Sequence, residues 1–282
     1  MSQKGKWGRF GGLAIAAASL AVASVFVWAK YAQTAQVEAA DTGWVSIFNG
    51  KNLDGWYTYL QSSGKNNDPK GIIKVENGMI HVFDIPTGDE RQEFGYMATE
   101  KEYSNCRIRL QYKWGTKQFR GSSSSSTVLP PAPRVVGKRD AGLLYDIVGA
   151  DKVWPRLVEA QIQEGDTGDF WLVEGVSMTT TVESKENATY KEGGVPYTQT
   201  NGRVIKSANY EQPGWNTVEV ILDGDSVTQI VNGKVNNRGW NLRQPDPQNP
   251  NVMIPLTGGK IALEAEGAEV YYRDIQVKLL VK

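Results

Sequence analysis

The chain has 282 residues, with 31 Lys and Arg against 31 Asp and Glu, so its formal net charge is zero. A neutral balance argues against a partner held through phosphate neutralisation, and we expect no nucleic-acid partner. One histidine, His81, excludes a multi-histidine metal site, and one cysteine, Cys106, excludes an internal disulfide framework. We expect Cys106 to be a buried free thiol and His81 to be structural.

Basic residues precede a long uncharged run at the N-terminus. Lys4, Lys6 and Arg9 come before residues 10–29, and this order predicts an export segment over residues 1–29. The run is long for a signal peptide and barely long enough to span a bilayer, so it is either a cleaved signal peptide or a retained membrane anchor. Either way we expect the rest of the chain to be periplasmic or extracellular. Contact with a membrane is expected only through this segment, if it is retained.

The remaining sequence predicts one all-β domain. Residues 30–43 are small and polar and predict a linker. Over residues 44–282, short alternating runs recur between turn signals, and no window shows sustained helical periodicity. The prediction is an antiparallel β-sandwich whose first and last strands, VSIF and DIQVKLL, pair with each other. Glu76–Gly78 and Asp223–Gly224 are expected hairpin turns.

Two stretches interrupt the regular spacing of strands. Residues 120–139 are rich in Ser and Pro and predict a surface loop. Residues 178–213 are polar, with scattered Thr, Asn and Gly, and are long for a plain connection. They form either a lid or a set of short strands.

Polar and apolar side chains alternate along the strand predicted at 156–164. The apolar set is Val158, Ala160 and Ile162, and the polar set is Glu159, Gln161 and Gln163. In a sandwich the apolar set faces the core, so the polar set faces away from it. On a flat or convex sheet the polar set is a solvated surface. On a concave sheet it is the floor of a groove, beside rings such as Trp154 and Tyr145, and such a groove suits sugars.

A second strand has the same character, because Ile261, Leu263 and Ala265 alternate with polar positions that include Glu264 and Glu266. Two residues apart on a strand, these carboxyls are separated by about 7 Å along the backbone, within the range of glycosidase acid pairs. The first strand carries only one acid, Glu159, which argues against a two-acid glycosidase built on that strand. Either the pair is completed across strands, with Asp140, Asp169, Glu264 or Glu266 as the partner, or one base works with several hydrogen-bond donors.

Six segments in order resemble the 3-keto-disaccharide hydrolase domain, long a domain of unknown function. They are WVSIFNGKNLDGW, YKWGTKQF, KRDAGLLYDIVG, VWPRLVEAQIQEGDTGDFW, GWNTVEVILDGDSVTQIVNG and GGKIALEAEGAEVYYRDIQVKLL, and together they span residues 44 to 280. The resemblance implies a concanavalin-A-like jelly-roll β-sandwich in an exported protein that acts on an oligosaccharide or keto-sugar. It implies cleavage of 3-keto-glycosides by base-initiated elimination across C1–C2, followed by hydration.

The resemblance suggests roles for particular residues. Glu159 would be the base, with Glu264 and Glu266 as further catalytic candidates. The expected substrate-binding residues are Gln161, Gln163, Asp140, Tyr145, Asp146, Trp154 and Arg273. Arg273 would neutralise developing charge if it faces the groove, and otherwise it pairs with a structural carboxylate.

The chain departs from the family pattern at several positions. Relatives carry His where this chain has Asp146, others carry Gln and His at Glu264 and Glu266, and a His often lies near Gln229. The acid–base equipment is therefore made of carboxyls alone, or it has been lost. Loss would leave a non-catalytic carbohydrate-binding module, and a structural or interaction role at the cell surface is a third alternative.

One acidic turn offers oxygen ligands for a hard cation. Glu164, Asp166 and Asp169 could bind calcium, although their spacing matches no specific loop signature and also suits a plain acidic turn. We expect no other cofactor.

Overall fold

The computed structural model describes residues 43–85, 93–117 and 138–280. The chain divides into Met1–Ala40 and Asp41–Lys282, and every described residue belongs to the second unit. The expected export segment, nearly all of the expected linker 30–43 and most of the Ser- and Pro-rich stretch 120–139 lie outside the described residues. Among the described residues, no helix has the length and apolar character needed to cross a bilayer.

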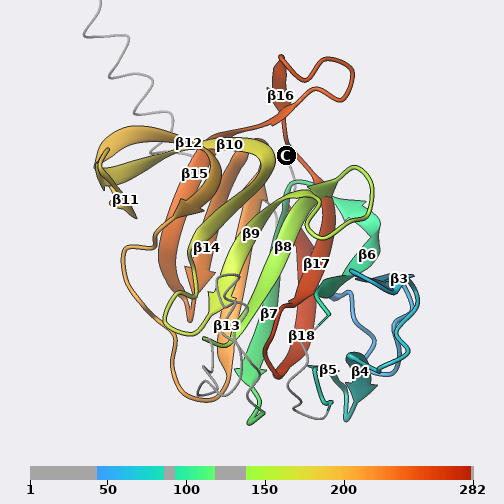
Figure 1. The fold of residues 1–282 in the computed structure, drawn as a ribbon. Coiled ribbons are helices and arrows are strands. Elements are labelled where there is room, and N and C mark those ends of the chain that lie inside the picture. The colour runs from blue at the N-terminus through green and yellow to red at the C-terminus, as the bar shows by residue number, and fades with distance from the viewer. Residues whose placement is uncertain (1–42, 86–92, 118–137, 281–282) are drawn as a thin grey trace, which may run out of the picture. The chain divides into compact units, whose positions relative to one another are not determined.

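The described residues form a β-sandwich of jelly-roll type, as the sequence predicts (Figure 1). The paired strands of the described residues are antiparallel, and they form two sheets that pack face to face. Alternating apolar residues suit this arrangement because each strand then contributes one face to the core between the sheets.

Sheet A contains the two chain-terminal strands, with β18 at its centre. Its strands pair in the order β4 (Ile73–Glu76), β5 (Met79–Val82), β18 (Val270–Leu279), β7 (Cys106–Trp114), β13 (Asn216–Asp223) and β14 (Ser226–Val231). The short strand β1 (Val45–Ser46) pairs with the far end of β18, where Val45 lies opposite Val277. The predicted pairing of the first and last strands is therefore confirmed, and so are the two hairpin turns, which join β4 to β5 and β13 to β14.

Sheet B contains the two polar strands noted in the sequence. Its order is β3 (Gly64–Lys65), β2 (Trp56–Leu60), β6 (Gly95–Tyr103), β17 (Gly259–Ala265), β8 (Asp140–Val148), β9 (Arg156–Gln163), β10 (Phe170–Ser184) and β12 (Val195–Val204). Figure 1 shows β17, β8 and β9 side by side. The stretch 178–213 forms strands rather than an irregular lid, because it contains the end of β10, β11 (Asn187–Tyr190) and β12.

One strand belongs to both sheets. β15 (Lys234–Pro245) pairs with β14 of sheet A through Lys234–Gly239, and its later residues Trp240 and Arg243 pair with β10 of sheet B. At its end β15 also pairs with β16 (Met253–Pro255). The two sheets are therefore joined along one edge by a continuous backbone.

The main core lies between the sheets and confirms the alternation read from the sequence. Val158, Ala160 and Ile162 of β9 lie in it, as do Ile261, Leu263 and Ala265 of β17. Cys106 is a free, buried thiol there, as predicted, and burial raises its pKa to about 12. A smaller apolar cluster covers part of the opposite face of sheet B, with Tyr57, Tyr96, Leu144, Leu157 and Ala262 among its members.

Candidate functional site

The candidate site lies on the face of sheet B that is turned away from the core, which we call the polar face. Glu159 on β9 is opposite Leu144 on β8, and Leu144 is opposite Ala262 on β17. Two residues further along, Gln161 of β9 is opposite Gly142 of β8. Continuing the register of β17 with β8 by one residue places Glu264 on the other side of Gly142. Directly paired residues share a face, so the polar positions of β9 and β17 lie on the same surface with β8 between them.

Two carboxyls meet above Gly142. A β-carbon at Gly142 would lie 2.6 Å from Glu264 Oε2 and 2.7 Å from Glu159 Oε1. Because both distances are measured to one point, the two oxygens cannot be further apart than their sum, 5.3 Å. The missing side chain of Gly142 is therefore what lets acids from two strands approach each other.

These two oxygens are buried and have no hydrogen-bond partner. Glu159 is 7% exposed and Glu264 is 2% exposed, and the unpaired atoms are the same Oε1 and Oε2 that lie above Gly142. Buried polar groups in native proteins are almost always paired, so two unpaired carboxyl oxygens that lie close to one point make this place a candidate site.

Burial and mutual repulsion keep protons on this group of acids. Burial raises the pKa of Glu159 and of Glu264 well above the usual range, and neighbouring carboxyls raise both further. Burial also raises the pKa of Glu266 to about 8 and that of Asp140 to about 6. The described groups that shift the pKa of Glu159, Glu264 and Glu266 include acids and no Lys or Arg. We call Asp140, Glu159, Glu264 and Glu266 the carboxyl cluster.

The two glutamines of β9 hold one member of the carboxyl cluster. Gln161 Nε2 donates to Asp140 Oδ1 at 2.6 Å, and Gln163 Nε2 donates to Asp140 Oδ2 at 2.5 Å. Both hydrogen bonds favour the ionised form of Asp140 and oppose the effect of burial. The amides predicted to contact a sugar thus position a carboxylate in this structure.

Aromatic side chains lie beside the carboxyl cluster. Tyr96 is directly opposite Glu264 in the sheet and stacks on Tyr59 at 5.6 Å between ring centres. Trp154, from the β8–β9 connection, lies 6.4 Å from the Tyr96 ring centre. On the other side, Trp171 is directly opposite Glu159. Tyr96 is fully buried, whereas Trp154 and Trp171 are partly exposed. Partly exposed rings on both sides of polar side chains are typical of surfaces that bind sugars.

A partly buried acid that the sequence did not single out, Asp151, anchors the β8–β9 connection. Asp151 accepts hydrogen bonds from Tyr57 Oη at 2.5 Å and Tyr96 Oη at 3.0 Å, and Lys65 Nζ donates to it at 3.1 Å. Burial alone would raise the pKa of Asp151, but these hydrogen bonds outweigh it and the pKa is lowered. No local sequence pattern could have identified Asp151, since its partners are 55 to 94 residues away.

Three predicted site residues lie elsewhere, and their expected roles are corrected. Tyr145 is in the core, where its hydroxyl accepts a hydrogen bond from Gln229 Nε2 at 3.0 Å. Asp146 lies at a bulge in β8 with a φ of 50° and is buried near the Cys106 thiol, which belongs to sheet A. Arg273 is on β18 in sheet A, where it donates to Gln111 and stacks on Trp215.

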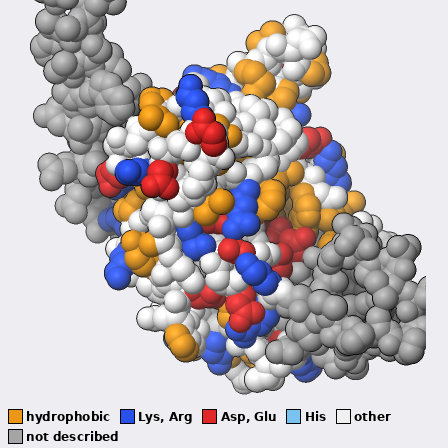
Figure 2. Space-filling view, turned by 60° about the vertical axis from the view of Figure 1, so that its left-hand side comes forward, with side chains coloured by type: hydrophobic (Ala, Val, Ile, Leu, Met, Phe, Trp, Pro, Cys, Tyr) orange, Lys and Arg blue, Asp and Glu red, His pale blue; other side chains and the backbone are white. Residues whose placement is uncertain are grey.

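The acids proposed for calcium are paired with basic side chains. Arg139 contacts Glu164 at 2.8 Å, Lys138 contacts Asp166 at 2.5 Å, and Arg203 contacts Asp169. Acidic and basic side chains also lie next to one another over much of the surface shown in Figure 2. These three acids do not converge on a common point among the described groups, and calcium binding stays a prediction.

The fold and the carboxyl cluster define an all-β jelly roll with a set of acids, amides and rings on one sheet face. The chain belongs to the family of 3-keto-alpha-glucoside-1,2-lyase-like domains, which it matches over residues 43–278. This membership places the chain among carbohydrate-active domains and agrees with the family resemblance seen in the sequence.

Solved structures resemble the chain at low identity. A provisionally assigned glycosyl hydrolase from Parabacteroides distasonis is 18% identical, with 85% of this chain and 94% of that chain covered and a TM-score of 0.49. A carbohydrate-binding module from Bacillus subtilis is 10% identical, with 80% and 97% covered and a TM-score of 0.41. A beta-glucanase from Bacillus licheniformis is 12% identical, with 86% and 100% covered and a TM-score of 0.42. No curated protein matches the chain.

Proposed function

We propose that the polar face cleaves 3-keto-glycosides by elimination and hydration. Membership of the 3-keto-alpha-glucoside-1,2-lyase-like family supports the substrate class. The observation that carries the proposal is the pair of buried carboxyls above Gly142, each with a free oxygen. Such a pair can take a proton from one atom of a bound sugar and give a proton to another.

The reaction needs one base and one acid. A carbonyl at C3 acidifies the proton at C2, so a base removes that proton and the C1–O bond to the leaving group breaks. An acid protonates the departing oxygen as an alcohol, and hydrogen-bond donors stabilise the enolate oxygen at C3. Water then adds at C1 and a proton returns to C2, so that the net change is hydrolysis of the glycosidic bond.

The order of the pKa values suggests which carboxyl has which role. Glu159 and Glu264 have strongly raised pKa values, which suits them to donate protons at neutral pH. Glu266, with a pKa of about 8, is ionised in part near neutrality and shares a hydrogen bond with Glu264. Glu266 is also the most exposed of the three glutamates, so we assign the base to Glu266 and move Glu159, the base expected from the sequence, to the role of acid.

Asp140 is the most acidic member of the carboxyl cluster, with a pKa of about 6. Both of its oxygens accept hydrogen bonds from glutamine amides. We give it an electrostatic role, because a fixed negative charge at this place keeps protons on its neighbours.

The decisive experiment measures aglycone release from a chromogenic 3-keto-glucoside by the full chain. We expect Glu266→Gln, Glu159→Gln and Glu264→Gln each to lower kcat by about 10² to 10⁴, the usual contribution of a positioned acid or base. The matched control is Glu164→Gln, which changes an exposed glutamate just after β9 that pairs with Arg139 and lies outside the carboxyl cluster. Full activity in Glu266→Gln would show that the base is another group, and no release by the unaltered chain would refute the reaction.

A non-catalytic sugar-binding role is the second candidate. It is favoured by the partly exposed rings of Trp154 and Trp171 on either side of the carboxyl cluster. Calorimetry with unoxidised oligosaccharides and 3-keto-sugars separates the two functions, because a binding module would give a saturable isotherm without release of aglycone. For the location we keep the proposal made from residues 1–29, namely a periplasmic or extracellular domain, whose test is fractionation of cells that express the full chain.

A further inference from the structure

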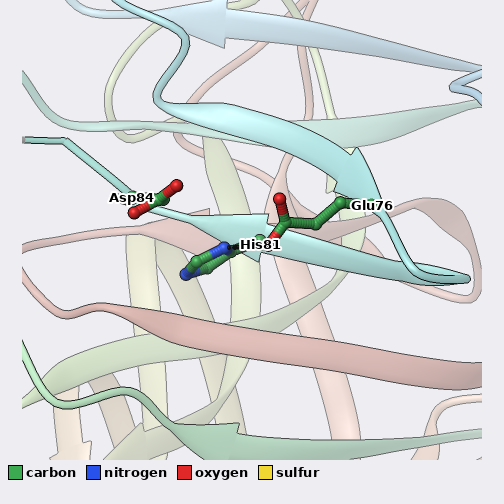
Figure 3. A group of neighbouring side chains, drawn as sticks. All are labelled: Glu76, His81 and Asp84. Carbon is green, nitrogen blue, oxygen red and sulfur yellow. Dashed lines mark hydrogen bonds and ion pairs between the residues drawn. The ribbon is translucent and has the colours of Figure 1, made fainter.

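A second group of ionisable residues lies on sheet A, on the hairpin formed by β4 and β5. Glu76 is the last residue of β4, His81 is on β5 and Asp84 follows β5 (Figure 3). One ligand atom from each of these residues lies within 4.8 Å of the other two. Among the described residues, no other group of His, Cys, Asp and Glu converges in this way.

The distances are close to those that a metal ion requires. His81 Nδ1 and Glu76 Oε1 are 2.6 Å apart. A zinc-type ion sits about 2.0–2.2 Å from nitrogen and oxygen ligands, so tetrahedral ligands are about 3.3–3.4 Å apart. The two atoms need to separate by less than about 1 Å, and Glu76 is on the surface with a side chain that is 40% exposed. A rotation of the Glu76 side chain would provide this separation.

The far side of the imidazole is already arranged as in a metal-binding histidine. His81 Nε2 lies 2.9 Å from Glu269 Oε1. The other oxygen of Glu269 accepts hydrogen bonds from the backbone N–H groups of Thr116 and Lys117, both at 2.7 Å. Glu269 is buried and cannot turn away. A carboxylate that accepts a hydrogen bond from Nε2–H keeps the ring hydrogen on Nε2 and leaves the Nδ1 lone pair for a metal. This is the usual support for a histidine ligand.

Both ring nitrogens of His81 face carboxylate oxygens, Nδ1 that of Glu76 and Nε2 that of Glu269. With the ring hydrogen on Nε2, the Nδ1 lone pair and the Glu76 oxygen face each other, and a divalent cation between them would be bound by both. The Tyr271 ring stacks on the imidazole, with ring centres 4.0 Å apart, and holds its plane.

We propose that His81 Nδ1, Glu76 and Asp84 bind a zinc-type divalent cation, with Glu269 as the residue that orients His81. One nitrogen and two carboxylate ligands suit zinc and its neighbours better than calcium, which takes oxygen ligands. The fourth position would be open to water or to a ligand, because Glu76 and Asp84 are on the solvent side. The site belongs to sheet A and is independent of the function proposed for the polar face.

Two lysines compete with the cation for Asp84. Lys74 Nζ lies 3.4 Å from Asp84 Oδ2, and Lys117 pairs with Oδ1. Each of these side chains is 33–39% exposed, and exposed ion pairs are weak and screened by salt. They reduce the affinity for the metal without closing the site, and the affinity should rise when the competition is relieved by Lys74→Met.

The test is calorimetry of the tag-free full chain with zinc chloride, with cobalt(II) absorption as a second readout. We expect one equivalent to bind, a rise in Tm with zinc, and cobalt bands typical of a four- or five-coordinate ion. Glu76→Gln and His81→Gln should abolish binding at this site. Asp274→Asn, an exposed acid elsewhere on sheet A, is the matched control and should bind zinc like the unaltered chain.

Glu269→Gln is the sharpest variant because it keeps the shape of the side chain. Its amide oxygen can still accept from Thr116 and Lys117, but its NH₂ group would donate to His81 Nε2 and so place the ring proton on Nδ1. Zinc binding should weaken by tenfold or more while Tm without zinc changes little. The proposal is overturned if the unaltered chain binds no zinc, or if binding persists in both Glu76→Gln and His81→Gln.

Discussion

At the scale of single residues, the candidate site depends on the fact that residue 142 is a glycine and has no side chain. Glu159 and Glu264 come from different strands and both occupy the space above Gly142. Two buried acids so close together cannot both ionise without a large electrostatic cost, so at least one proton stays in the group at neutral pH. The carboxyl cluster can therefore present an acid and a carboxylate together.

Gly142→Ala tests whether the close approach matters. The new methyl group would lie within 2.7 Å of an oxygen of each carboxyl and would push them apart. We expect a loss of about 1–3 kcal/mol in the free energy of unfolding, typical of overpacking, and a loss of at least tenfold in aglycone release. Urea unfolding and the 3-keto-glucoside assay measure the two effects.

A double-mutant cycle supplies the control for this variant. In a Glu159→Ala background, one of the two clashes is gone, so Gly142→Ala should cost less than it does in the unaltered chain. Equal costs in the two backgrounds would mean that the methyl group does not meet the carboxyl of Glu159.

The sequence predicted some members of the site and missed others, for a physical reason. Alternation along one strand shows which residues share a face, and Glu159, Gln161 and Glu264 were found in this way. It does not show which strand lies next to which, so the roles of Gly142 and Asp151 could not be predicted from the sequence. Their partners are distant in the chain and meet only through sheet pairing.

At the scale of strands, a polar side chain crosses the core to hold the site. Gln229 on β14 of sheet A is fully buried. Its Nε2 donates to the backbone oxygen of Glu159 at 3.1 Å and to the Tyr145 hydroxyl at 3.0 Å. One amide from the opposite sheet thus fixes the backbone beneath a member of the carboxyl cluster.

Gln229→Leu should weaken both the fold and the site. It would leave the Tyr145 hydroxyl without its donor in a dry core, at a cost of about 1–3 kcal/mol in the free energy of unfolding. Tyr145→Phe is the matched control, because it removes one acceptor, keeps the ring and should cost less. A Gln229→Leu variant that is as stable to urea as the unaltered chain would show that the hydrogen bonds of Gln229 to sheet B do not stabilise the fold.

Errors in the sequence-based assignment also belong to the scale of strands. Tyr145 was expected on the polar face, but it pairs with Val158 and shares its core side, and the bulge that follows breaks the alternation before Asp146. Arg273 was expected near the substrate, but β18 belongs to sheet A. Bulges and the choice of sheet depend on contacts between distant segments, which a local pattern does not contain.

At the scale of the whole molecule, the buried acids make the folded state sensitive to pH. Burial raises the pKa of Glu266 from 4.5, the ordinary value of a glutamate, to about 8, and that of Asp140 from 3.8, the ordinary value of an aspartate, to about 6. Between the unfolded and the folded pKa of each group, the folded state binds more protons than the unfolded state. Stability therefore falls as pH rises through this window.

We expect the free energy of unfolding to be greatest near pH 5 and to fall towards pH 8, by about 1.4 kcal/mol for each pH unit and each carboxyl that titrates fully within the window. Acids with lowered pKa values, such as Glu164 and Asp166, lose their contribution only below the usual carboxyl range. Urea unfolding at several pH values measures the profile. Glu266→Gln should flatten it and raise stability at pH 8, and a profile that rises between pH 5 and pH 8 would contradict the buried-acid account.

The overall architecture was the part most open to prediction from sequence. Periodicity of two, turn pairs and the absence of helical windows were sufficient for an all-β sandwich, since these signals are local. The division of strands between the sheets, and the passage of β15 from sheet A to sheet B, were not predictable from any single segment.

The strict alternation along β9 has a consequence for how such a domain can evolve. A substitution at Glu159, Gln161 or Gln163 changes the chemistry of the polar face and leaves Val158, Ala160 and Ile162 packed in the core. An insertion or deletion that shifts the register of the strand by one residue would exchange the two sets and turn Glu159 towards the core between the sheets. The chemistry of the polar face can therefore change by substitution alone, whereas a change in the length of β9 has to be absorbed by a bulge if both faces are to be kept.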